Sequence, residues 1–97
     1  MDTLQIQQKL TSLENILKTI FNEIIGLKND DYKFSLNYSD FRGIDIKIIS
    51  LSNKTFAKIL GKKAKTIQSI RRLIEIWGTR NSMSVYISLE SNEEEMV

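Results

Sequence analysis

The sequence predicts a single α+β domain in which helices pack on a three-stranded sheet. Its 97 residues, 41% of them hydrophobic, suffice for one core but not for two. Apolar residues recur at helical spacing in three stretches and alternate with polar residues in three others, in the order α-β-β-α-α-β. We expect a helical extension at residues 1–12, the folded domain at 13–90 and a flexible acidic tail at 91–97.

The first predicted element is a helix over residues 3–27. Its apolar positions recur at spacings of four and three, namely Ile6, Leu10, Leu13, Leu17, Ile20, Ile24 and Leu27. Ile16, Phe21 and Ile25 widen this stripe, so residues 13–27 should cover a sheet. The first half offers only a narrow seam, which is either an ordinary helix edge or a surface for self-association.

Two strands joined by a hairpin come next. The first has apolar residues at every second position, namely Tyr32, Phe34, Leu36 and Tyr38. Residues 39–43 supply turn chemistry, and a second strand alternates through Ile44, Ile46 and Ile48. The alternation slips at Ile48–Ile49, which predicts a bulge or the end of the strand.

Two helices and a last strand complete the predicted fold. Ser52 or Asn53 can cap a short helix that runs to Leu60, and Gly61 stops it. A second helix starts near Ala64 and ends at Gly78. Its apolar face consists of Ile67, Ile70, Leu73, Ile74 and Trp77. The third strand alternates through Met83, Val85, Ile87 and Leu89.

Composition excludes several classes of function. The chain has no Cys and no His, which removes disulfides, thiolate zinc sites, the cysteine nucleophile and the commonest general base. We therefore expect a protein that is not an enzyme and uses no metal or cofactor. No stretch has the pattern of a signal peptide or the length of a membrane span, so we expect a cytoplasmic protein without a membrane partner.

Charge is concentrated in one segment. Residues 54–80 carry eight basic residues against one acidic residue, Glu75, although the formal net charge of the whole chain is only +2. Such a segment is either a solvated helix surface or a footprint for phosphate. Charge alone favours the first interpretation.

The pentapeptide Leu60-Gly61-Lys62-Lys63-Ala64 favours the second. It joins the two predicted helices, and Gly61 permits a sharp reversal and a close approach of the backbone. The unpaired N–H groups at the start of the next helix and the positive end of its dipole attract anions, and neighbouring lysines strengthen that attraction. Ile59, Leu60 and Ile67 are candidates for an apolar groove in which bases would lie beside the loop.

These residues resemble the KH domain, and in particular the small stand-alone bacterial KH RNA-binding proteins (the KhpA-like group). That family carries Ile-Gly-x-x-Gly-x-x-Ile between two helices. The matching stretch here runs from Leu60 to Ile67, and Ile70-Arg71 follows where the family has an apolar residue and Arg. The resemblance covers about residues 13–90 and implies a type II KH topology.

The match departs from the family at the second glycine of the loop, which is Ala64, and at Ala57, where the family often has Gly. In the first turn of a helix Ala64 would carry no φ penalty. At a position that needs positive φ it would cost on the order of 1 kcal/mol or more. The tyrosines Tyr32, Tyr38 and Tyr86 could stack bases, but aromatic residues in sheets more often serve packing.

The resemblance implies binding of single-stranded RNA, about four nucleotides per domain, in post-transcriptional regulation. The residues expected to contact RNA are Lys58, Ile59, Leu60, Gly61, Lys62, Lys63, Ala64, Lys65, Ile67 and Arg71, with Arg72 adding attraction. Two alternatives stay open: a protein-interaction or dimerisation module with a degenerate KH loop, and a ribosome-assembly factor. The implied protein partners are a second copy and a second, larger KH-containing RNA-binding protein.

Overall fold

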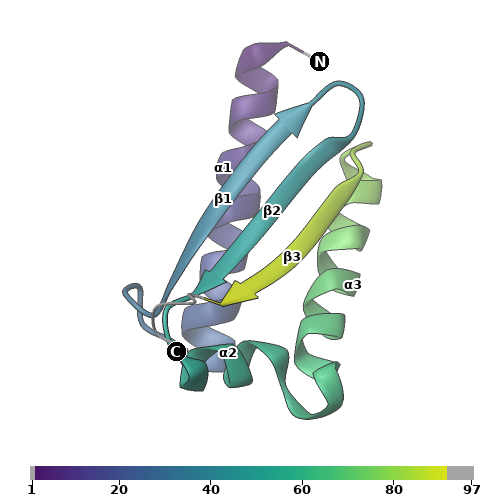
Figure 1. Ribbon diagram of the computed structural model, residues 1–97. Coiled ribbons are helices and arrows are strands. Elements are labelled where there is room, and N and C mark those ends of the chain that lie inside the picture. The colour runs from purple at the N-terminus through teal and green to yellow at the C-terminus, as the bar shows by residue number, and fades with distance from the viewer. Residues whose placement is uncertain (1, 92–97) are drawn as a thin grey trace.

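A computed structural model describes residues 2–91 and contains the predicted order of elements (Figure 1). The elements are α1 (Thr3–Thr19), a π-helical turn η1 (Ile20–Ile25), β1 (Tyr32–Ser39), β2 (Gly43–Ser50), α2 (Asn53–Leu60), a 3-10 turn η2 (Lys62–Ala64), α3 (Lys65–Arg80) and β3 (Val85–Ser91). The fold is α+β, as predicted. Of the expected acidic tail, Ser91 belongs to β3, and residues 92–97 lie outside the described residues.

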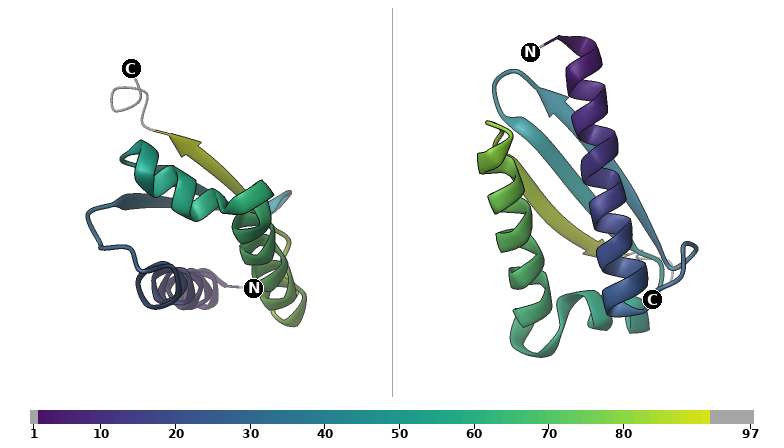
Figure 2. Two further views of the ribbon diagram at one scale, coloured as in Figure 1. Left: turned by 90° about the horizontal axis from the view of Figure 1, so that it is seen from below. Right: turned by 180° about the vertical axis from the view of Figure 1, so that it is seen from behind.

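The sheet has three strands in the order β1-β2-β3 and is mixed. β1 pairs antiparallel with β2 across the hairpin, whereas β3 pairs parallel with β2 after the crossover through α2 and α3. Figure 2 shows α1 and α3 on the same face of this sheet, with α2 near one end. Nowhere in residues 2–91 is there a helix with both the length and the apolar character for crossing a membrane.

The core lies between the sheet and the helices. The inward positions of β2 are Ile44, Ile46, Ile48 and Ser50, all at most 2% exposed. The register places Tyr32 and Tyr38 of β1 on this same side. The rings of Tyr32, Phe21 and Phe34 pack together, with centroids 4.9 to 5.1 Å apart in all three pairs. The other face of the sheet is open and carries Tyr86 opposite Asp45.

The start and end of the first helical segment have local causes. Asp2 and Gln5 form a capping box, in which the Gln5 N–H donates to Asp2 Oδ1 at 2.8 Å. At the other end the N–H groups of Gly26 and Leu27 both donate to the carbonyl of Phe21, and Gly26 adopts a left-handed conformation with φ 85°. The helix therefore stops at Ile25.

The π-helical turn alters the predicted apolar stripe. Leu13, Leu17, Ile20 and Phe21 are buried as expected, but Ile24 is 74% exposed. A π-helical turn pairs residues five apart and so rotates the following side chains relative to an α-helix. The prediction that Ile24 continues the stripe is therefore wrong, and the half-buried Ile25 packs against the core instead.

Three further expectations need correction. β2 has no bulge at Ile48–Ile49, since it continues in register to Ser50, whose hydroxyl donates to the Ser52 carbonyl at 2.6 Å. α3 does not end at Gly78 but continues to Arg80. Gly78 is a buried residue of this helix, and close packing requires glycine there because a Cβ would lie 2.6 Å from the carbonyl oxygen of Met83. Leu73, predicted to face the core, is 53% exposed.

Candidate nucleic-acid interface

The loop between α2 and α3 owes its shape to Gly61. Ser52 caps α2 by accepting the Thr55 N–H at 3.1 Å, and the helix ends where Gly61 donates to Ala57 at 2.9 Å. Gly61 has φ 77° and ψ 171°, a backbone region that is essentially restricted to glycine. A Cβ at Gly61 would lie 2.5 Å from the Cβ and 2.8 Å from the backbone nitrogen of Thr66. Conformation and close approach therefore both require glycine.

The next part of the loop contains two left-handed residues. Lys63 has φ 56° and ψ 32°, and Ala64 has φ 60° and ψ 21°. Ala64 precedes α3 as its N-cap rather than lying in its first turn, so it does carry the φ penalty. Each left-handed residue with a Cβ costs about 1–2 kcal/mol. Strain of this kind concentrates at functional sites, which makes this turn a candidate site.

Two backbone N–H groups of the loop have no acceptor in the described part of the chain. The Ala64 N–H donates to the Gly61 carbonyl at 3.1 Å and the Lys65 N–H donates to the Lys62 carbonyl, whereas the N–H groups of Lys62 and Lys63 donate to nothing among residues 2–91. The first N–H groups of α3 add further donors and the positive end of a helix dipole. This arrangement suits an anion.

Six exposed basic side chains surround the loop. They are Lys58, Lys62, Lys63, Lys65, Arg71 and Arg72. No carboxylate oxygen of the described residues lies within 4.0 Å of their nitrogen atoms. Glu75 is the single acidic residue on α2 and α3. The surface is therefore predominantly positive, and none of these six cations is ion-paired with residues 2–91, which favours a polyanion.

The apolar residues in and beside the loop fall into two groups. Ile59 and Ile67 are 0% and 2% exposed and belong to the core. Leu60 and Ala64 are half-buried. Ile59 and Ile67 therefore fix α2 and α3 from beneath and offer no surface to a ligand in this structure. Of the predicted groove residues, only Leu60 comes to the surface beside the lysines, and Ala64, predicted to contact phosphate, is half-buried next to it.

Sequence reasoning did not single out a second cluster at the tip of the β1–β2 hairpin. The guanidinium carbon of Arg42 lies 4.1 Å from the ring centroid of Tyr86, and its Nε donates to both carboxylate oxygens of Asp45 at 2.8 and 3.0 Å. The hydrogen bond to Asp45 raises the pKa of Arg42. The neighbouring Phe41 is fully exposed. Local patterns hint at an outward Tyr86 but cannot reveal the β2–β3 register that places it beside Asp45.

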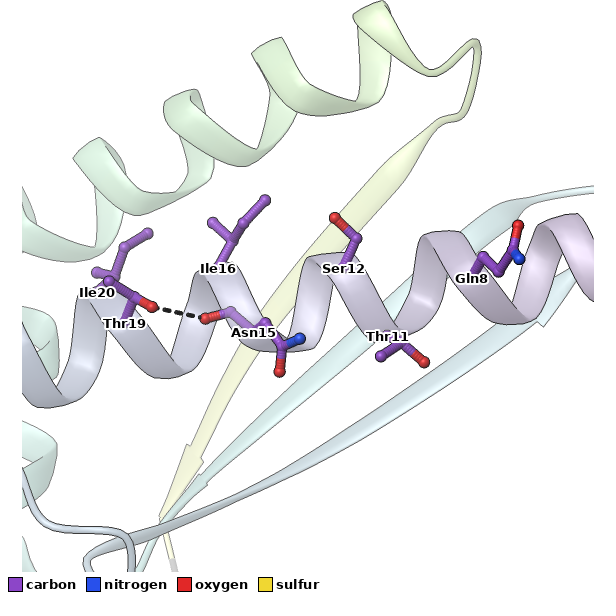
Figure 3. A pocket seen from close by; sticks show the side chains of 7 residues that line it. All are labelled: Gln8, Thr11, Ser12, Asn15, Ile16, Thr19 and Ile20. Carbon is purple, nitrogen blue, oxygen red and sulfur yellow. Dashed lines mark hydrogen bonds between the residues drawn. The ribbon is translucent and has the colours of Figure 1, made fainter.

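Two hollows lie on the helical side of the molecule. One, of about 590 Å³, follows α1, where Ser12, Ile16 and Ile20 point toward α3 (Figure 3). The adjoining hollow is lined by Trp77 and by Lys9, whose Nζ donates to Asn81 Oδ1 at 2.6 Å. Neither contains a residue of the basic loop. Residues 2–91 contain no group of three or more acidic side chains arranged to hold a metal ion.

Comparisons of this chain with protein-family models, with curated proteins and with solved structures found no match.

Proposed function

We propose that the protein binds single-stranded RNA and that the Gly61–Lys65 loop holds its phosphates. The observation that carries this proposal is the strained turn at Lys63 and Ala64, next to two backbone N–H donors without acceptors among the described residues. The exposed lysines of the loop add charge at the same place. The order α-β-β-α-α-β and the mixed sheet are compatible with a type II KH domain, which supports the same function.

The proposed contacts divide between phosphate and base. The N–H groups of Lys62 and Lys63, together with the side chains of Lys62, Lys63 and Lys65, would hold phosphate oxygens. Leu60 would support a base beside the loop. Because three or four phosphates are neutralised, the logarithm of the affinity should fall with the logarithm of salt concentration with a slope of about 2–3.

A pair of charge-reversed variants tests the proposal. Lys62→Glu with Lys63→Glu removes the loop charge, and Lys28→Glu with Lys33→Glu makes the same change in net charge at exposed lysines of another region. Binding of a fluorescein-labelled, randomised RNA pool of ten nucleotides is measured by fluorescence anisotropy. Circular dichroism verifies that both variants are folded. We expect the loop variant to lose binding and the matched control to lose about tenfold or less, through long-range charge alone.

Equal affinity of the loop variant and the matched control would refute the assignment. A second measurement separates attraction from loop geometry. Ala64→Gly keeps every charge and removes one methyl group at the left-handed position. If a phosphate approaches the backbone closely at this point, Ala64→Gly should bind RNA at least as tightly as the natural chain.

A second candidate function is binding of a protein, either another copy or a KH-containing partner. It is favoured by two apolar side chains on the outer surface of α3, Leu73 and Ile76, each 53% exposed. The predicted seam of α1 supports it less, because Leu10 already packs against the protein's own core. Light scattering of the natural chain and of Leu73→Asp with Ile76→Asp tests it. An identical monomer mass for both would exclude self-association through this surface.

A further inference from the structure

The hairpin tip holds a planar cation in a fixed orientation. Asp45 binds the Arg42 Nε through both carboxylate oxygens, and Tyr86 lies against the guanidinium group. The Arg42 side chain is nevertheless 58% exposed, and Tyr86 is 44% exposed. Phe41 contributes a fully exposed aromatic ring from the same turn. We call Phe41, Arg42 and Tyr86 the hairpin platform.

A series of adjoining hollows connects the loop to the hairpin platform. The first lies on the outer surface of α3, beginning at Lys65 and extending to Arg71 and Glu75. The second shares Arg71 and Glu75 with the first and reaches Arg42 and Tyr86. The third shares Arg42 and Tyr86 with the second and opens onto the uncovered face of the sheet. These surfaces form a continuous track from the start of α3 to the edge strand β3.

We propose that single-stranded RNA held at the loop continues along this track and stacks its bases on the hairpin platform. The inference rests on the proposed function and extends it from a site for about four nucleotides to a longer path with two chemically different ends. The loop holds phosphates, and the hairpin platform holds bases.

The charges near the hairpin platform favour bases over phosphates at that end. Arg42 is paired with Asp45, and Lys47 Nζ lies 3.8 Å from a carboxylate oxygen of Glu90. Paired cations attract phosphate weakly, but a guanidinium plane and an aromatic ring stack on any base. This surface does not suit a protein partner, because it presents two exposed aromatic rings among charged and polar residues rather than a contiguous apolar patch. Single-stranded nucleic acid is therefore the occupant that fits.

The length of the track sets the length of RNA that reaches the hairpin platform. Lys65 and Glu75 are ten residues apart on α3, which corresponds to about 15 Å at 1.5 Å per residue. A stacked strand advances about 3.4 Å per nucleotide, so this part of the path takes at least four or five nucleotides. RNA of four nucleotides held at the loop ends before the hairpin platform, whereas RNA of ten nucleotides reaches it.

The test uses the whole chain and Phe41→Ala. Phe41 is fully exposed, so its removal leaves the core unchanged. Ile24→Ala is the matched control, because Ile24 is also an exposed apolar residue and lies on η1, away from the track. Dissociation constants are measured by fluorescence anisotropy for randomised RNA pools of four and of ten nucleotides. We expect Phe41→Ala to bind the longer pool about 5- to 50-fold more weakly and the shorter pool unchanged.

A second variant tests the plane of the platform. Arg42→Lys keeps the positive charge but loses the planar group and the two hydrogen bonds to Asp45. Arg42→Lys should weaken binding of the longer pool as Phe41→Ala does. Phe41→Tyr keeps an aromatic ring and should bind the longer pool with the natural affinity. Ile24→Ala should bind both pools as the natural chain does.

The other outcomes distinguish failure of the track from failure of the proposed function. If Phe41→Ala and Arg42→Lys bind the longer pool as the natural chain does, while Lys62→Glu with Lys63→Glu loses both pools, the track is wrong and the proposed function stands. If the loop variant binds both pools normally, both proposals are wrong. Equal losses for Phe41→Ala and Ile24→Ala would assign the effect to exposed apolar surface and refute the hairpin platform.

Discussion

Gly61→Ala should destabilise the protein far more than an ordinary glycine substitution. At φ 77° and ψ 171° a residue with a Cβ carries backbone strain of about 1–3 kcal/mol. The new Cβ would also lie 2.5 Å from the Thr66 Cβ, and relieving such overpacking costs about 1–3 kcal/mol more. The free energy of unfolding should therefore fall by about 2–6 kcal/mol, a large part of the 5–15 kcal/mol typical of a native protein.

Gly26→Ala is the reference for a positive-φ substitution without a collision. Gly26 also has positive φ, at 85°, but a Cβ there would meet nothing within 4 Å. Its substitution should cost only the left-handed strain of about 1–2 kcal/mol. Any excess cost of Gly61→Ala over Gly26→Ala therefore reflects the close approach of α3 together with the stricter backbone region at ψ 171°.

Urea unfolding followed by the fluorescence of Trp77, the single tryptophan, gives both values. For a protein of this size the free energy of unfolding falls by about 1–2 kcal/mol per molar urea. If the collision costs about 2 kcal/mol, the urea midpoint of Gly61→Ala should therefore lie about 1 M or more below that of Gly26→Ala. Thr66→Gly removes the side-chain atoms that collide, and in that background the cost of Gly61→Ala should shrink by about 1 kcal/mol or more. Equal midpoints for the two alanine variants would refute the described loop geometry.

Three further outcomes are expected. Ala64→Gly relieves about 1 kcal/mol or more of backbone strain, while the greater entropy of the unfolded chain costs about 0.4–1 kcal/mol. Its urea midpoint should therefore equal or exceed that of the natural chain. A lower midpoint would contradict a left-handed Ala64. Gly78→Ala should lower the free energy of unfolding by about 1–3 kcal/mol, because the new methyl group overpacks against the carbonyl of Met83. The same change at a solvent-exposed glycine in a helix would raise the free energy of unfolding, so urea denaturation distinguishes the two cases. Burial raises the pKa of Tyr32 above its ordinary value of 10.0. The neutral Tyr32 therefore contributes its full stabilisation of the fold below pH 10, and this stabilisation is lost as the pH rises through the pKa of the folded state. The alkaline decline in melting temperature should be shallower in Tyr32→Phe.

The helices and strands were predictable because caps and the spacing of apolar residues mark each of them locally. Ser52 caps α2 as expected, and alternation in β1 and β3 matches their buried faces. The errors occur where tertiary contacts decide. Gly78 looks like the end of a helix, yet it lies inside α3. Glycine is needed there because the chain at Met83 passes too close for a Cβ. The repeated isoleucines at 48 and 49 suggested a slip, but the pairing with β1 keeps the strand regular.

The candidate site was predictable in its residues and not in its shape. The lysines and Gly61 were visible because they stand between two helical patterns. Ala64 is left-handed and precedes α3, whereas the sequence was compatible with either a helical or a left-handed conformation at this position. The burial of Ile59 and Ile67 likewise follows from how both helices pack on the sheet. The contact of Arg42 with Tyr86 needs the register of two strands that are far apart in the sequence.

The parallel pairing of β2 with β3 also sets an order of events during folding. The β1–β2 hairpin closes a short turn, whereas β3 reaches β2 only after the chain has crossed over through α2 and α3. Non-local pairing of this kind forms slowly, because the entropy of closing the loop is lost before any contact compensates for it. The basic loop lies within that crossover. We therefore expect the shape of the loop to mature together with the docking of the last strand, so that the proposed binding of RNA would follow that docking.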